Sequence, residues 1–303
     1  MVRIGDVELH LMRPVDRPVR WIGQDELIDQ ILACWTTITA TDVPLCPRLV
    51  GKPGMGKTTL AQAAAQRLDR PVFILQCTMD TRPEDLLVTP VLRADGGISY
   101  RASSLVSAML LGGVVILDEA NRMSEKSWAS LAPLLDNRRY VESQVAGIRI
   151  ESHPDFRCCI TMNDDASTYE IPEYIISRIQ PMVAVDYPTL TEEREILAYN
   201  IDFAPEELVR MCAEFLQESH RFRLDYSTRD GINMMRYALK LQATQGKPLD
   251  DAFAQAITQV LGPDASDFEA RARDNMINEN LVGFDELFGW QGDDEDDREE
   301  PKP

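Results

Sequence analysis

The segment GKPGMGKTT, residues 51–59, constrains the fold of this chain more than any other feature. It fits the pattern G-x-x-x-x-G-K-[ST], in which glycines let backbone N–H groups turn inward around phosphate groups. The short apolar run RLVG, residues 48–51, leads into it, and the good helix former TTLAQAAAQRLD follows. A strand, a glycine-rich loop and a helix in this order predict a phosphate site at a helix N-terminus. The alternative is a glycine-rich turn that binds nothing.

Each residue type in this loop has an expected task. Lys57 is expected to reach the β- and γ-phosphates of a nucleotide, and the Thr58 hydroxyl to ligate Mg²⁺. The predicted nucleotide-binding residues of the loop are Gly51, Pro53, Gly54, Met55, Gly56, Lys57, Thr58 and Thr59.

Further apolar runs rich in Val, Ile, Leu and Cys follow, and they show little alternation between apolar and polar residues. They are residues 72–77, 113–119, 156–163 and 182–188. Strands buried on both faces have this composition, so we expect a parallel sheet covered by helices. After Pro188 the strand pattern ends, and residues 191–280 have helical spacing. This α/β region is therefore followed by a smaller all-helical domain.

Two of these runs end in residues that suit phosphate chemistry. The run GVVILDE ends in Asp118 and Glu119, and two adjacent acids after a buried strand are costly without a purpose. Asp118 is placed to hold Mg²⁺, and Glu119 to accept a proton from an attacking water. Asn163 ends the run FRCCITMN, where its amide would orient that water if the two strands are neighbours. A helix cap at the acids and a simple turn at Asn163 are the alternatives.

The composition limits the classes of partner. The 303 residues are 44% hydrophobic, which is ample for a core, and carry a net charge of −19. A protein that binds nucleic acid usually presents a basic face, so DNA is not expected to be the main partner. The apolar stretches are too short to span a bilayer, and the charged N-terminus is unlike a signal peptide. The sequence therefore predicts a cytoplasmic protein without membrane insertion.

The three motifs in this order resemble an AAA+ ATPase, and the detail resembles the MoxR-like branch with its nitric-oxide reductase and Rubisco activase-type relatives. GGISYRASSLVSAMLLGGVVILDEANRMS is similar to the branch's helix-2 insert and Walker B motif, and HPDFRCCITMN to its sensor 1 strand. STYEIPEYIISRI resembles the run that ends in the arginine finger, and YPTLTEEREIL the entry to the helical lid. The resemblance covers residues 21–241.

The resemblance implies further roles. Arg178 matches the arginine finger, which in this family completes the active site of a neighbouring subunit, and Arg229 matches the lid arginine called sensor 2. Ile22 and Gly23 lie where the family places backbone around adenine. Arg122, Arg138 and Arg139 fall in segments at an expected subunit contact. The cofactors implied are ATP and Mg²⁺.

The resemblance also implies a domain order and an activity. The expected regions are an N-terminal arm (1–20), an AAA+ nucleotide-binding domain (21–189), a helical lid (190–290) and an acidic disordered tail (291–303). We expect an ATP-hydrolysing homo-oligomeric ring, a hexamer, that remodels a protein client, with a von Willebrand A-domain protein as the suggested partner. The rival hypotheses are a nucleotide-dependent assembly switch with little turnover, and a restriction-type GTPase or nucleic-acid motor of the same superfamily.

Overall fold

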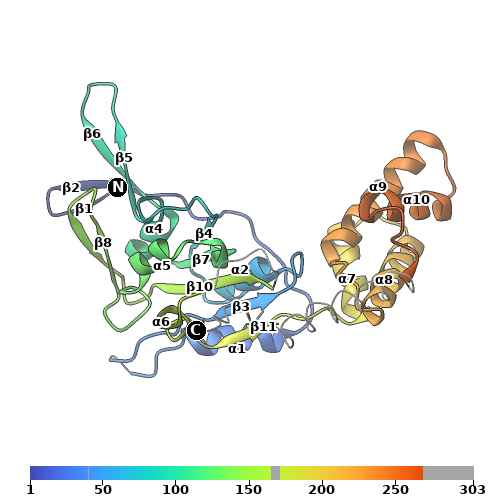
Figure 1. Ribbon diagram of the computed structural model, residues 1–303, viewed down its shortest axis with the longest axis horizontal. Helices are drawn as coiled ribbons and strands as arrows, with labels where there is room; N and C mark the ends of the chain where they lie inside the picture. Colours follow the sequence, from blue (N-terminus) through green and yellow to red (C-terminus); the bar gives the residue numbers. More distant parts are fainter. Residues whose placement is uncertain (40, 165–170, 269–303) are drawn as a thin grey trace, which may run out of the picture. The chain divides into compact units, whose positions relative to one another are not determined.

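The computed structural model describes residues 1–39, 41–164 and 171–268, which form two compact units (Figure 1). The first unit comprises residues 1–203 and 227–232, and the second comprises residues 204–226 and the described residues from 233 onward. The end of the expected lid, beyond residue 268, and the predicted acidic tail lie outside the described residues.

A parallel five-stranded sheet forms the centre of the first unit, with the strand order β11-β3-β10-β7-β4. The strands are β3 (Arg48–Gly51), β4 (Val72–Gln76), β7 (Val114–Asp118), β10 (Arg157–Asn163) and β11 (Met182–Ala184). Each falls within one of the five predicted apolar runs, and the predicted parallel α/β sheet is confirmed. The order places β10 between the strand that enters the glycine-rich loop and the strand that ends in the two acids.

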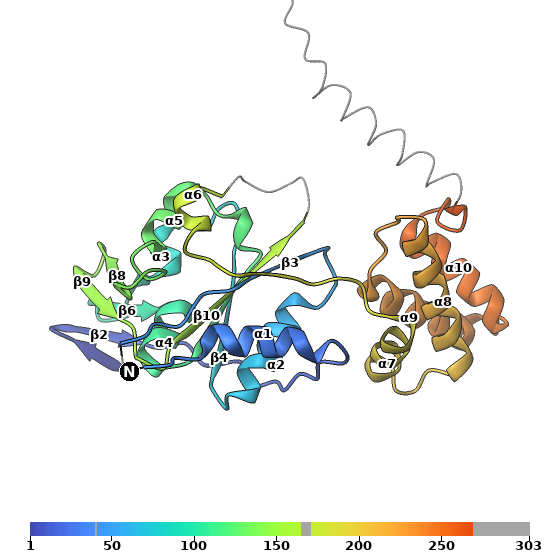
Figure 2. The ribbon, with the colours of Figure 1, turned by 90° about the horizontal axis from the view of Figure 1, so that it is seen from below.

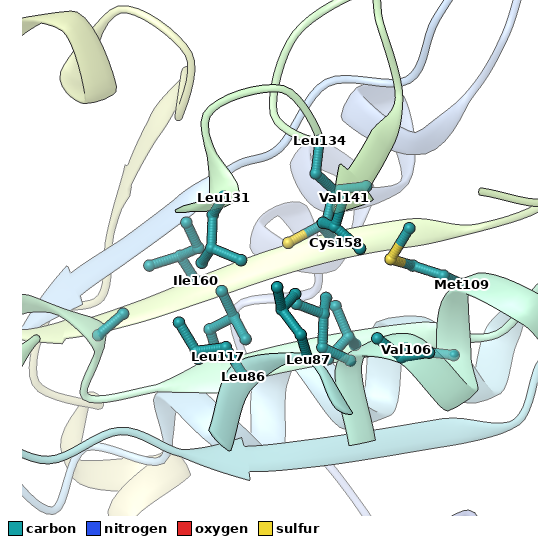
Figure 3. Close-up of a cluster of buried hydrophobic side chains, with 14 of the residues drawn as sticks. Leu86, Leu87, Val106, Met109, Leu117, Leu131, Leu134, Val141, Cys158 and Ile160 are labelled. Carbon is teal, nitrogen blue, oxygen red and sulfur yellow. The ribbon is translucent and has the colours of Figure 1, made fainter. Parts of the chain in front are cut away.

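Both faces of this sheet are covered, which explains the missing alternation in its strands. In β7, Val114 and Ile116 pack with buried residues of α1 (Asp25–Trp35) and α2 (Lys57–Arg67), which lie together in Figure 2. Val115 and Leu117 point to the opposite cluster, which includes α4 (Ser104–Leu111). Figure 3 shows part of that second cluster, with Leu117 and Ile160 from the sheet and Val106 and Met109 from α4.

A second sheet lies beside the first and has the order β1-β2-β6-β5. Its strands are β1 (Val2–Ile4), β2 (Val7–His10), β5 (Val88–Leu92) and β6 (Ile98–Ala102). The N-terminal segment, expected to be an arm, forms two strands, and β2 pairs in parallel with β6 of the hairpin seen beside it in Figure 1. The other elements that lie wholly in the first unit are α3 (Pro83–Leu86), the 3₁₀ turn η1 (Ala120–Arg122), α5 (Glu125–Leu131), β8 (Tyr140–Ser143), β9 (Ile148–Glu151), α6 (Glu173–Ile176) and α7 (Leu190–Asn200).

The second unit is built from helices α8 (Glu206–Arg221), α9 (Thr228–Gln245) and α10 (Leu249–Leu261), of which α9 begins in the first unit. Buried residues of α8 recur at helical spacing, namely Leu208, Val209, Cys212, Ala213 and Leu216. Phe215 of α8 packs edge-on against Phe253 of α10, with ring centroids 6.4 Å apart. The breaks between these helices fall near Pro205, Ser227 and Pro248.

Candidate functional site

The glycine-rich loop connects the end of β3 to the start of α2. Gly54 and Gly56 have φ angles of 83° and 82°, which favour glycine over any residue with a Cβ atom. A Cβ atom on Gly54 would also lie 2.4 Å from the hydroxyl of Ser227. The loop therefore takes its shape from both glycines. It presents the first-turn N–H groups of α2, which have no carbonyl partners within the helix, to a ligand.

Lys57 is the first residue of α2, and its side chain returns along the loop. Its Nζ donates to the carbonyl oxygens of Gly51 and Lys52, at 2.8 Å each, and the residue is 6% exposed. A buried ammonium group of this kind is costly unless it is well hydrogen-bonded. These two carbonyl oxygens hold the Lys57 ammonium group beside the loop backbone, where it could contact a bound phosphate.

The carboxylate of Asp118, at the end of β7, accepts hydrogen bonds from both α2 and β10. Its Oδ1 accepts hydrogen bonds from the Thr58 hydroxyl at 2.5 Å and from the Thr161 hydroxyl at 2.6 Å. A hydroxyl and a carboxylate oxygen beside a phosphate loop are hard oxygen donors, and this donor set fits Mg²⁺, which prefers few protein ligands together with substrate phosphates. Thr58 and Asp118 could therefore hold that metal.

Glu119 is fixed at both its backbone and its side chain. Its φ angle is 53°, an uncommon value for a residue with a side chain, and its N–H donates to the Thr161 hydroxyl at 3.0 Å. Its Oε1 accepts from Asn163 Nδ2 at 3.1 Å, and its Oε2 lies 2.8 Å from Arg122 Nε. A hydrogen bond at one carboxylate oxygen and an ion pair at the other thus orient the group.

Asn163 ends β10 opposite Gly51 of β3. It is 7% exposed, and its carbonyl oxygen accepts a hydrogen bond from Asn121 Nδ2 at 2.8 Å. Neighbouring parallel strands end at the same edge of a sheet, so the predicted loop, acids and amide meet there as the sequence suggested. Thr161, which bridges both acids, was not predicted, because a threonine inside a buried strand carries no functional pattern.

A cavity of about 410 Å³ adjoins the loop within the first unit. Its lining includes the predicted residues Ile22, Gly54, Met55, Gly56, Thr59 and Arg229, the adjacent Trp21, and also Tyr199 and Asn200, which were not predicted. The Trp21 ring lies 3.2 Å from the position of a Cβ atom on Gly56. Gly23 is not part of the lining. Its φ angle of 77° and the neighbouring Glu192 side chain indicate a tight turn.

Arg178 lies outside this group of residues. Its Nε donates to Asp136 Oδ2 at 3.3 Å, its Nη1 donates to the carbonyl oxygen of Tyr174, and its guanidinium lies over the Tyr174 ring. None of these three residues lines the cavity beside the loop. The structure thus brings the predicted loop, metal and water-activating residues together and leaves the predicted arginine finger apart from them.

A buried acid lies near the start of α9. Glu193 of α7 is 0% exposed, and burial raises the pKa of its carboxyl to about 7, an effect that a hydrogen bond with the Thr228 side chain reduces. No helix among the described residues has the length and apolar character needed to cross a membrane.

Comparison with known families gives one matching domain. Residues 48–179 match the model of the AAA domain, dynein-related subfamily. This range runs from β3 to the residue after Arg178 and so includes the loop, both acids and Asn163.

Curated relatives match the chain over different lengths. Protein CbbQ of Hydrogenophilus thermoluteolus is 28% identical over 153 residues, 50% of this chain and 57% of that protein. Protein NorQ of Paracoccus denitrificans is 27% identical over 265 residues, covering 83% and 90%. Mouse von Willebrand factor A domain-containing protein 8 is 26% identical over 212 residues, covering 63% of this chain and 11% of that protein. The chain spans less than three-fifths of the length of the first curated relatives, 57% for both CbbQ and the NirQ protein of Pseudomonas aeruginosa.

Solved structures show the same architecture. The RuvB Holliday junction branch migration motor of Thermotoga maritima superposes with a TM-score of 0.54 at 17% identity, over 80% of this chain and 71% of that one. A mutant form of the same motor gives a TM-score of 0.56. At this identity the likeness concerns the fold, which is that of a P-loop AAA+ protein with a C-terminal helical region.

Proposed function

We propose that this chain, which belongs to the MoxR-like branch of the AAA+ proteins, binds ATP with Mg²⁺ and hydrolyses it to ADP and phosphate. The observation that carries the proposal is the hydrogen-bonded group at the sheet edge. Thr58, Asp118, Thr161, Glu119 and Asn163 come from one helix and two neighbouring strands, and each bonds to another member. A phosphate loop alone supports binding, whereas the adjacent acids supply a metal ligand and a base.

The loop and the cavity would share the nucleotide. Gly51, Pro53, Gly54, Met55, Gly56, Lys57, Thr58 and Thr59 would surround the phosphates. The lining around Trp21, Ile22 and Arg229 would receive the base and ribose, since adenine suits a mostly apolar cleft with a few polar groups. Gly23 contributes the turn that places Ile22.

Thr58 and Asp118 would hold Mg²⁺, which neutralises phosphate charge when it is bound. Glu119 would accept the proton of the attacking water. That role needs one carboxylate oxygen to face the water, so either the Asn163 hydrogen bond or the Arg122 ion pair on Glu119 must break during the reaction. Asn163 and Arg122 are therefore the residues that set the direction of the base.

The active site would be completed by another copy of the chain. Arg178 lies on a different part of the first unit from the loop network and is 29% exposed at its side chain. A homo-oligomeric ring, as the resemblance implies, would bring Arg178 of one copy to the nucleotide of the next. Arg229, at the beginning of α9, would touch the nucleotide of its own chain and link hydrolysis to the helical lid. The ring is proposed to be a hexamer.

A protein client is proposed as the target of the ring. The mouse relative carries, by its name, a von Willebrand A domain in the same chain as the segment that matches here, which supports such a domain as the partner class. The net charge of −19 disfavours a nucleic-acid client. All six cysteines are buried and none forms a disulfide, which supports a reducing compartment such as the cytoplasm as the location.

The substitution Glu119→Gln tests the activity. It should lower steady-state ATP hydrolysis about 10²- to 10⁴-fold, the usual contribution of a general base, while the Kd for ATP stays within about twofold. Glu125→Gln, at a neighbouring exposed acid, is the matched control and should leave turnover unchanged. Normal turnover in Glu119→Gln would exclude the assigned base.

The same assay addresses the two rivals. An assembled wild-type ring that binds ATP but releases no phosphate, even with its client, would be an assembly switch. Tighter binding of GTP than of ATP, or turnover stimulated by DNA across a range of salt concentrations, would favour a GTPase or a nucleic-acid motor.

A further inference from the structure

Two arginines from distant parts of the sequence converge on one carboxylate. Asp136, in the turn after α5, accepts hydrogen bonds at Oδ1 and Oδ2 from Arg138, with a shortest distance of 2.8 Å to Arg138 Nη2. Its Oδ2 also accepts from Arg178 Nε at 3.3 Å. We call Arg138 and Arg178 the arginine pair.

The charge of this group is unbalanced. The two guanidinium groups keep their charge at all physiological pH values. Arg138, through its side-chain hydrogen bonds, and Arg178 lower the pKa of the Asp136 carboxyl to about 2. Two cations and one anion leave a local excess of one positive charge, in a chain whose total charge is −19.

A nearby ion pair provides the contrast. Arg149 pairs with Glu142 at 2.7 Å and stacks over the Tyr140 ring at 4.3 Å, so one cation meets one anion. Exposed pairs of that kind are ordinary and contribute little to stability. Arg138 also lies over Tyr140, at 6.0 Å, but shares its carboxylate with a second arginine.

The arginine pair is held at the surface. The side chains of Arg138 and Arg178 are 52% and 29% exposed, and that of Asp136 is 23% exposed. Each guanidinium has five N–H donors in a planar fork, which matches the oxygens of a phosphate. Together the two side chains offer more donors than the two oxygens of Asp136 can accept.

We propose that Arg138 and Arg178 together bind the terminal phosphate of a nucleotide held by a second copy of this chain, and that Asp136 is the positioning residue that keeps the two guanidinium groups adjacent. This inference rests on the proposed function, because it takes Arg178 to be the finger of a shared site. It adds a second phosphate-binding arginine and the acid that orients both.

Assembly provides a test that does not require hydrolysis. In the Glu119→Gln background, ATP should drive assembly more strongly than ADP, measured by sedimentation velocity. Adding Arg138→Ala should weaken the ATP-dependent assembly by about tenfold or more in concentration, as expected for loss of a charge-assisted contact to phosphate, and leave assembly with ADP unchanged. Arg149→Ala is the matched control and should assemble like its parent.

Steady-state kinetics test the positioning role in the wild-type background. Asp136→Asn should lower kcat while leaving the KM for ATP unchanged, because the loop of the same chain is untouched. Asp136→Glu should recover part of the loss. In the Arg138→Ala/Arg178→Ala background, Asp136→Asn should have no further effect, since coupled residues are not additive. Arg138→Lys keeps the charge and loses the fork, so its kcat should fall between those of wild type and Arg138→Ala.

The outcomes separate this inference from the proposed function. If the wild type hydrolyses ATP and Arg178→Ala impairs it, but Arg138→Ala and Asp136→Asn retain full kcat and ATP-dependent assembly, the paired site is wrong and the function stands. If the wild type does not hydrolyse ATP but Arg138→Ala selectively weakens assembly with ATP, the paired site stands and the proposed hydrolysis is wrong.

Discussion

The sheet edge around Asp118 and the surface around Asp136 both place side chains on a carboxylate, yet they are built differently. At the edge, hydroxyl groups of Thr58 and Thr161 reach Asp118 from a buried helix start and a buried strand. At the surface, two arginines reach Asp136 from a turn and a short helical segment. The first group lies within one chain, whereas the second holds one more positive than negative charge, which we propose that a partner complements.

The difference has a structural cause. Strands in a sheet fix their ends within a fraction of an ångström through backbone hydrogen bonds, which suits groups that must hold a metal and direct a base. Long arginine side chains on a surface can shift at low energetic cost, which suits a contact that forms and breaks as subunits move. The comparison predicts that substitutions at the edge act within one subunit, while those at the surface act on its neighbour.

Arg178→Ala would give the largest effect and tests that division directly. Loss of an arginine finger should reduce kcat by about 10³-fold or more, with little change in the Kd for ATP. Mixing Arg178→Ala with Lys57→Ala subunits should recover part of the activity, because some sites would then combine an intact loop with an intact finger. No recovery in rings shown to be mixed would mean that Arg178 acts in its own chain.

Glu193→Gln tests the burial of the acid that lies near the start of α9. The pKa of Glu193 is about 7 in the folded protein and 4.5 for an ordinary glutamate. Below pH 4.5 Glu193 is protonated in both the folded and the unfolded protein, so it does not lower the free energy of unfolding. As pH rises from 4.5 to 7 the unfolded chain ionises first, and the free energy of unfolding falls by about 3 kcal/mol.

Chemical denaturation at a series of pH values measures this contribution of Glu193 to the free energy of unfolding. Above pH 7, Glu193→Gln should be more stable than wild type by up to about 3 kcal/mol, and the advantage should vanish below pH 4.5. Glu195→Gln, on the same helix and not buried, is the control and should follow wild type. A wild-type stability that stays flat from pH 4.5 to 7.5 would contradict the raised pKa.

Thr161→Val tests the buried group around Asp118 at the edge of the sheet. It removes the hydroxyl that joins Asp118 to the backbone of Glu119 with almost no change in volume, so kcat should fall about tenfold, equivalent to about 1.4 kcal/mol. The Mg²⁺ concentration needed for half-maximal activity should rise as well. Thr161→Ser keeps the hydroxyl and should retain most activity. An unchanged metal dependence would limit Thr161 to a packing role.

Arg122→Gln should have the smallest effect. It removes the ion pair but leaves the Asn163 hydrogen bond on Glu119, so kcat should change by only about threefold. Arg122→Lys keeps the positive charge and should retain most of the wild-type kcat. A loss as large as that of Glu119→Gln would show that Arg122 itself contacts the substrate.

Much of the sheet edge could be predicted because its signals are local. Buried strands ending in Asp118, Glu119 and Asn163 follow a phosphate loop, and parallel strands bring such ends together. Thr161 was missed because its neighbours in sequence are all apolar and its function depends on the register of β10 against β7. Register between strands distant in sequence cannot be read from one chain.

The surface around Asp136 was less accessible to sequence reasoning. Arg138 and Arg178 were named only through the resemblance, and nothing in the segment LLDNRRYV links its aspartate to a residue 42 positions away. The N-terminal strands were partly missed for a similar reason. β2 is stabilised by pairing with β6, about 90 residues later in the chain, and a segment with charge every few residues gives a weak strand pattern.

That pairing has a practical consequence for truncation. Residues 1–20, expected to be an arm, include Leu9, which is fully buried, and the strand that covers one side of β6. A chain shortened to begin at Trp21 would expose the backbone amides of β6 as a new sheet edge and leave an apolar gap behind them. Such edges recruit other chains, so the shortened protein would tend to aggregate, although the glycine-rich loop and both acids at the sheet edge would still be present.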